Sequence, residues 1–113
     1  MPRSIADIGV LQQYIRGVLE RAEHHAANVD EVLFALAGAV VWRKDDEHLE
    51  VMLRDGDMKN VLWVHVDGTR YAIAYDHVTQ AIQVRRGSTH GPVLASFTNA
   101  TPHRGIKAFF AGL

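Results

Sequence analysis

The seven histidines of this chain are the first residues to consider for chemistry, and their spacing decides what they can do. His24 and His25 are adjacent, and neighbours on a helix point about 100° apart, so the two cannot reach one ion. Glu20 and His24 lie four residues apart, but no His-Glu-x-x-His array accompanies them. We therefore expect no metal site and no cofactor.

A basic turn from Arg85 to Gly91, with the sequence Arg-Arg-Gly-Ser-Thr-His-Gly, is the second candidate. Glycines expose backbone N–H groups, and guanidinium, hydroxyl and imidazole groups favour a phosphate or a carboxylate. No Walker A or dinucleotide motif is present, so a solvated hairpin turn is the alternative interpretation. The candidate anion-binding residues are Arg86, Ser88, Thr89 and His90.

Acid–base catalysis would need groups such as His65, Arg70, Tyr75, Asp76 and Arg85 to come together. The alternation of side chains along a strand places Tyr75 on the opposite sheet face from His65 and Arg70, so the set is scattered. The absence of cysteine excludes thiol catalysis. The sequence favours a protein that is not an enzyme, and we name no catalytic residue.

Helices are expected at the amino-terminal end. Apolar residues recur every three or four positions over residues 4–26, which predicts an amphipathic helix. A second, more deeply buried helix follows Asn28 and Asp30, which are expected to cap it. Its length is open, because Gly38 allows either a longer helix or a strand over residues 39–43.

After residue 48 the hydrophobic period changes from helical to alternating. Asp67-Gly68 is the strongest hairpin signal, since a type I′ turn needs positive φ at both central residues. Gln80 stands where the next hairpin loop would prefer glycine. The pattern predicts an antiparallel meander with strands over residues 49–53, 60–66, 69–75, 81–86 and 93–98.

A short helix is expected after the last strand, with Thr101 as its cap and Pro102 at its first position. The fold class is therefore α+β, as a single domain over residues 1–113. Two amino-terminal helices and the short carboxy-terminal helix pack on one face of a roughly five-stranded antiparallel meander.

One face of the predicted sheet is apolar and forms the core, and the other face is unusual. Counting back from the Asp67-Gly68 turn sets Trp63 opposite Ala72, with Ala74 close by. This face could be a contact surface, because Trp and Arg often dominate the energy of interfaces. The alternative is that Trp63 is buried under a neighbouring element. The candidate partner- or ligand-binding residues are Trp63, His65, Arg70, Ala72, Ala74 and Arg85.

Composition limits the class of protein. The formal net charge of -1 gives no global basic field for nucleic acid or an anionic membrane. The longest apolar run, Val32 to Trp42, is too short to cross a bilayer, and no signal peptide is expected. With no cysteine, the cytoplasm is the expected location.

Three stretches of the chain, Ala22–Asn28, Val61–Tyr75 and Gly91–Asn99, resemble small proteins encoded by bacterial integron gene cassettes. The resemblance implies a homo-oligomer with pockets near the subunit contacts, and it assigns no active-site residue.

The sequence thus leads us to expect a non-catalytic cytoplasmic protein of binding or assembly. Its partner would be a second copy of the chain, or a small ligand, on the Trp63 face of the sheet. The alternatives are a binder of single-stranded nucleic acid on the same face, or a small enzyme with an anion site from Arg85 to Gly91.

Overall fold

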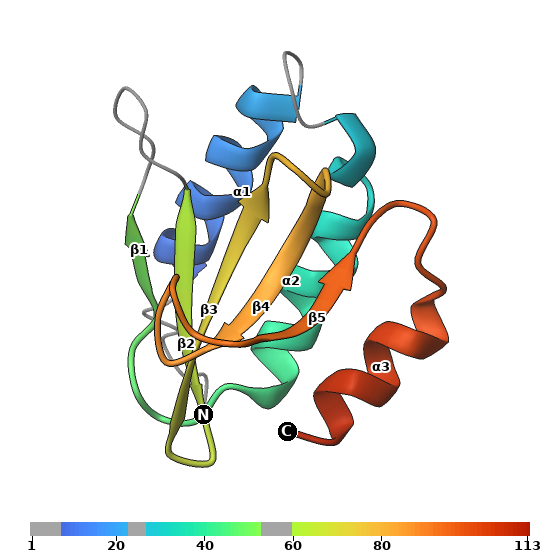
Figure 1. Ribbon diagram of the computed structural model, residues 1–113. Coiled ribbons are helices and arrows are strands. Elements are labelled where there is room, and N and C mark those ends of the chain that lie inside the picture. The colour runs from blue at the N-terminus through green and yellow to red at the C-terminus, as the bar shows by residue number, and fades with distance from the viewer. Residues whose placement is uncertain (1–7, 23–26, 53–59) are drawn as a thin grey trace, which may run out of the picture.

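The computed structural model describes residues 8–22, 27–52 and 60–113 of the chain. The five strands form one antiparallel sheet in the order β1-β2-β3-β4-β5 (Figure 1). The α+β meander predicted from the sequence is confirmed. The elements are α1 (Ile8–Ala22), the 3₁₀ turn η1 (Ala27–Val29), α2 (Val32–Arg43), β1 (Glu50–Met52), β2 (Val61–Val66), β3 (Thr69–Asp76), β4 (Ala81–Arg86), β5 (Val93–Phe97) and α3 (His103–Ala111).

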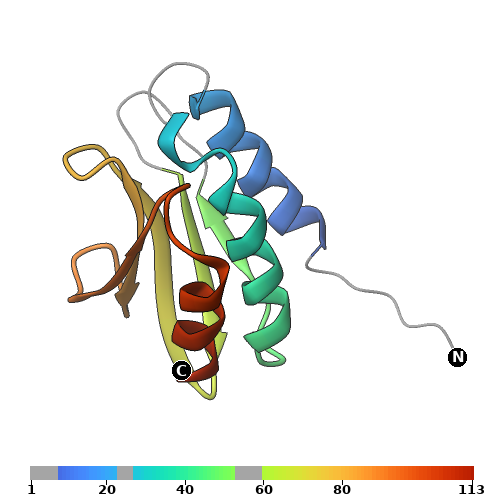
Figure 2. The same cartoon turned by 90° about the vertical axis from the view of Figure 1, so that its right-hand side faces the viewer.

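The molecule has two layers. Figure 2 shows the sheet on one side and α1 with α2 on the other, while α3 lies beside the β5 edge. The buried residues of α1, Leu11, Tyr14 and Val18, recur at helical spacing and join the core. The hydroxyl of Tyr14 donates a hydrogen bond of 3.1 Å to the carbonyl oxygen of Ile73, and burial raises the pKa of this tyrosine. The hydroxyl therefore stays protonated and ties α1 to the middle of the sheet.

The core face of the sheet agrees with the prediction. Its side chains project toward α1 and α2, and each is at least nine-tenths buried. They are Leu62, Val64, Tyr71, Ile73, Tyr75, Ile82 and Val84.

Helix α2 begins differently from the prediction. Glu31 occupies the cap position without a side-chain capping bond. The Oδ1 atom of Asn99 instead accepts hydrogen bonds of 2.9 Å from the N–H groups of Glu31 and Val32. The prediction that Asn28 and Asp30 cap this helix is wrong, because the side chain of Asn99 bonds to these amides instead. The Nδ2 group of Asn99 also donates a hydrogen bond of 2.8 Å to Asp30 Oδ1. A residue far away in sequence thus starts the helix.

The rest of α2 answers the question that the sequence left open. The segment over residues 39–43 is helical and not a strand. Ala39 and Val40 are both core residues, whereas adjacent residues of a strand would point to opposite faces. A helix can bury both side chains on one side.

Two hairpins set the register of the sheet. Asp67 and Gly68 have φ values of 50° and 80°, as a type I′ turn requires, and the predicted pairing of Trp63 with Ala72 is confirmed. The next hairpin pairs Asp76 with Ala81, which leaves a four-residue loop. Gln80 in this loop has a φ of 54°, so it adopts the left-handed conformation that favours glycine.

The carboxy-terminal helix corrects the sequence prediction. Pro102 has an extended ψ of 142° and is the cap residue, so α3 begins at His103. The hydroxyl of Thr101 does not cap this helix, because it accepts a hydrogen bond of 2.9 Å from the N–H of Thr98. Thr101 and Pro102 therefore belong to the turn that precedes the helix.

Candidate functional site

The sheet face turned away from the helices carries the predicted partner-binding residues, and we call it the outer face. The register places Glu50 opposite Trp63, Trp63 opposite Ala72 and Ala72 opposite Arg85. These four residues form one row across β1, β2, β3 and β4. The sequence prediction did not include Glu50, because the Asp67-Gly68 turn fixes the pairing of β2 with β3 and does not reach β1.

Trp63 and Arg70 form the centre of the outer face. The guanidinium carbon of Arg70 lies 5.0 Å from the centroid of the indole ring, within the range of a cation–π contact. Nη2 of Arg70 is also 3.9 Å from Oε1 of Glu50. The side chains of Arg70 and Glu50 are 41% and 60% exposed, so this ion pair contributes little stability. Arg70 thus shields one side of a partly buried indole.

His65 pairs directly with Arg70 across β2 and β3. The Nδ1 atom of His65 and the Nε atom of Arg70 are shielded from solvent and have no hydrogen-bond partner in the described part of the chain. Buried nitrogen atoms without a partner are uncommon in native proteins. Tyr75 lies on the core face, as expected, so the acid–base set is not assembled around these two residues.

The β4–β5 loop projects on the side of the sheet away from the helices (Figure 2). The guanidinium of Arg85 bonds to this loop. Nη1 of Arg85 donates to the carbonyl oxygen of Gly91 at 2.8 Å, and Nη2 donates to Oε1 of Gln83 at 3.0 Å. A hollow of about 10 Å³ remains between the loop and the sheet, enough for about one water molecule. It is lined in part by Ala72, Ala74, Gln83, Arg85 and Thr89.

The candidate anion site at this loop has few backbone donors left. The N–H groups of Gly87, Ser88, His90 and Gly91 donate to Arg70 O, Arg86 O, Ser88 Oγ and Ser88 O, respectively. Arg86 pairs with Tyr71 and so projects on the core side of the sheet rather than beside Arg85. An anion bound here would depend on side chains, since these amides are already used.

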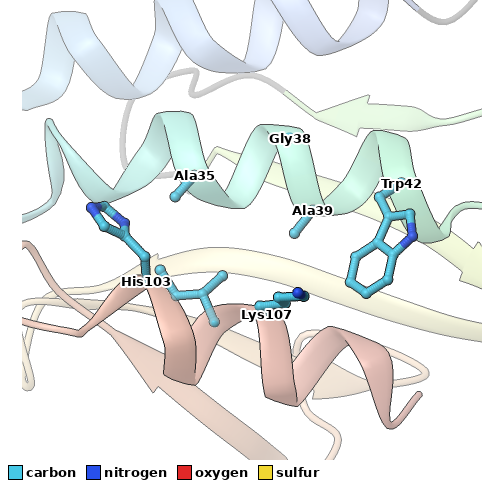
Figure 3. A pocket seen from close by; sticks show the side chains of 7 residues that line it. Ala35, Gly38, Ala39, Trp42, His103 and Lys107 are labelled. Atoms are coloured by element: carbon cyan, nitrogen blue, oxygen red, sulfur yellow. The ribbon is translucent and has the colours of Figure 1, made fainter.

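A second feature, which the sequence did not predict, is a groove between α2 and α3. Its volume is about 210 Å³. Figure 3 shows Trp42 of α2 and Lys107 and His103 of α3 at this groove. Its lining residues are Ala35, Gly38, Ala39, Trp42, His103, Ile106 and Lys107.

Helix α2 also exposes large apolar side chains. Phe34, Val41 and Trp42 keep 56%, 51% and 52% of their surface accessible. The signal was available in the unbroken apolar run from Val32 to Trp42. A surface helix needs apolar residues only on the side that faces the core. A helix that is apolar on all sides must therefore be buried all round or leave apolar surface exposed.

The carboxylate of Asp45 connects the end of α2 to the β2–β3 turn. The N–H of Glu47 donates to it at 2.9 Å and the N–H of Gly68 at 3.2 Å. The bond from Glu47, followed by that from Gly68 and by the nearby charges, lowers the pKa of Asp45. This carboxylate is therefore structural and remains ionised.

The distribution of His, Asp and Glu side chains bears on metal binding. The described residues contain no group of three His, Asp or Glu side chains placed to hold a metal ion. Within residues 8–22, 27–52 and 60–113, no helix is long and apolar enough to cross a membrane.

Comparison with known proteins identifies the family of the chain. No curated protein matches the chain at a significant level. Residues 11–107 match the family model described as "Integron cassette protein VCH_CASS1 chain", a range that includes α2 and the whole sheet. The chain therefore belongs to this family of integron cassette proteins, as the resemblance in its sequence indicated.

Proposed function

We propose that the protein is a non-catalytic assembly protein of the cytoplasm that associates with a second copy of itself through the outer face. The lack of cysteine in the sequence supports a reducing compartment. The observation that carries the proposal is the row of Glu50, Trp63, Ala72 and Arg85 across four strands.

This row is self-complementary. A two-fold axis parallel to the strands, midway between β2 and β3, would place Glu50 of one copy opposite Arg85 of the other. The same axis would place the Trp63 indole over the position of Ala72, which is itself only 1% exposed, so the indole would rest on the side chains around Ala72. Reciprocal contacts of this kind define the interface of a two-fold dimer.

The remaining properties of the outer face favour a flat partner over a small ligand. The hollow beside Thr89 holds about 10 Å³, so a small molecule has no room to enter there. Trp and Arg are also the residues that most often dominate interface energies.

Single-stranded nucleic acid, the alternative on this face, has less support. Such binders present several aromatic side chains for base stacking, whereas the indole of Trp63 already carries the Arg70 guanidinium. The acidic Glu50 in the same row would also repel phosphates.

Light scattering of the purified protein over a range of concentrations tests this proposal. We expect a dimer mass for the wild type and a shift toward monomer for Trp63→Ala. Glu50→Lys should act in the same direction, because it sets a cation against the partner's Arg85. Trp42→Ala, on the helical side, is the matched control and should keep the dimer mass.

Folding of each variant is checked by circular dichroism and urea unfolding. A monomeric wild type at every concentration would overturn the proposal, as would a Trp63→Ala variant that folds and keeps the dimer mass. Loss of mass in Trp42→Ala alone would move the interface to the helical side. Salt-dependent retention of single-stranded RNA by the wild type would favour the nucleic-acid alternative.

A further inference from the structure

The groove between α2 and α3 is independent of the outer face and lies on the other side of the sheet. Its floor contains two buried residues, Ala39 of α2 and Ile106 of α3. Gly38 also lines the groove and has no side chain to fill it. No atom lies within 4 Å of the position that a Cβ would take there. The groove has a volume of about 210 Å³, which limits any occupant to a small molecule.

The two basic side chains of the groove both come from α3, while the indole N–H of Trp42 is a polar group on α2. His103 and Lys107 are four residues apart, so they lie on the same face of the helix, one turn from each other. Both line the groove, and Figure 3 shows them on the side that faces α2. Among the described residues, no acidic side chain lines this groove. Its charge therefore complements an anionic group.

Trp42 forms the wall at the end of α2 opposite to His103 (Figure 3). Trp42 is 52% exposed, which leaves a large apolar surface beside the groove. An apolar group lying in the groove would remove part of this surface from water, and burial of apolar surface is favourable.

We propose that this groove binds a small amphipathic carboxylate. The apolar part of the ligand lies on Ala39 and Ile106 beside the Trp42 indole, and its carboxylate pairs with the Lys107 ammonium. The His103 imidazole donates a hydrogen bond to the same carboxylate. The site is distinct from the outer face and stands whether or not the protein forms a dimer.

The test uses the full chain with Trp63→Phe, so that Trp42 is the only tryptophan and its fluorescence reports on the groove alone. Octanoate is the probe, and octanol is the matched neutral probe. We expect octanoate to change the fluorescence of Trp42 in a saturable way. Octanol should bind with an affinity at least about tenfold lower, because it lacks the charge that Lys107 recognises.

Two pairs of variants separate binding from folding. Lys107→Ala should weaken octanoate binding by about tenfold, whereas Arg104→Ala, exposed on α3 outside the groove lining, should leave it unchanged. Gly38→Leu should abolish binding by filling the groove. Gly105→Leu is its control, since that glycine also has open space around it but lies outside the lining.

Each outcome supports or overturns the proposal. No saturable change with octanoate would overturn it, and so would equal binding of octanol and octanoate. A change in Trp42 fluorescence that follows protein concentration instead of octanoate would mean that a second copy covers the groove, which also overturns it. The Trp63→Phe background already lacks the tryptophan of the proposed interface. The octanoate result therefore does not depend on whether the wild type forms a dimer.

Discussion

The two tryptophans lie on opposite sides of the sheet and differ in how their surroundings are built. Trp63 is partly buried on the outer face, with the Arg70 guanidinium 5.0 Å from its ring. Trp42 is half exposed at the α2–α3 groove, with the Arg43 guanidinium 5.7 Å from its ring. The neighbours of Trp63 come from strands joined by short hairpins, whereas the groove beside Trp42 needs α3, which follows the whole sheet along the chain.

A sequence specifies a site more fully when neighbouring strands build it than when distant helices do. On the outer face, a two-residue turn fixes the neighbours of Trp63, because one register follows from one turn. In the groove, the neighbours of Trp42 depend on where α3 packs, and no local rule sets that position. If the two sides of the molecule are separate, changes on one side should leave the other unaffected.

The largest expected effect concerns the helical side. Asn99→Ala should lower the free energy of unfolding by about 2 kcal/mol, since it removes the acceptor for the Glu31 and Val32 amides and the partner of Asp30. Urea unfolding measures this change. Asn28→Ala, which removes one exposed bond to the Gln80 carbonyl, should cost about 0.5 kcal/mol or less. Equal losses in the two variants would contradict the capping role of Asn99.

The next effect concerns the hairpin that carries part of the outer face. Gln80→Gly should raise the free energy of unfolding by about 1 kcal/mol, because Gln80 has a φ of 54° and glycine adopts it without strain. Gly68→Ala is the reciprocal variant and should lower stability by about 1 kcal/mol or more, since its φ is 80°. Thermal unfolding of both variants checks the pair. Opposite signs are required, and the same sign in both would show that backbone strain does not decide these turns.

The smallest effect separates stability from binding in the groove. Gly38→Ala should raise the free energy of unfolding by about 0.5–1 kcal/mol, because the site is helical and has open space for a Cβ. Octanoate should nevertheless bind this variant less well, since the added methyl group lies in the groove. Gly105→Ala should give a similar gain in stability with unchanged binding. Tighter binding by Gly38→Ala would show that the groove is not where octanoate lies.

Much of the fold could be predicted because its signals are local. The positive φ values at Asp67 and Gly68 and the core side chains of the sheet follow from turn chemistry and alternation. The errors fell at the starts of helices. Asn28, Asp30 and Thr101 are good capping residues by type, but the amides or hydroxyls concerned find other partners in the folded chain.

The candidate sites divide in the same way. Trp63, Ala72 and Arg85 were grouped correctly on one face from the register alone. That Arg85 is bonded to the Gly91 carbonyl, and that Arg86 projects to the other side, depends on the path of the β4–β5 loop. Loop paths are set by long-range contacts, so the sequence could offer this loop only as an open choice between an anion site and a turn.

The order and type of the elements, the two sheet faces and the pairing around the Asp67-Gly68 turn could be read from local patterns, since each is encoded by periodicity over a few neighbouring residues. Three features emerged only when the chain was folded: Asn99 bonds to the first amides of α2, Trp42 stays half exposed beside α3, and a groove with Lys107 on its rim lies between the two helices. These features depend on segments far apart in the chain, whose distances are fixed by packing around a shared core.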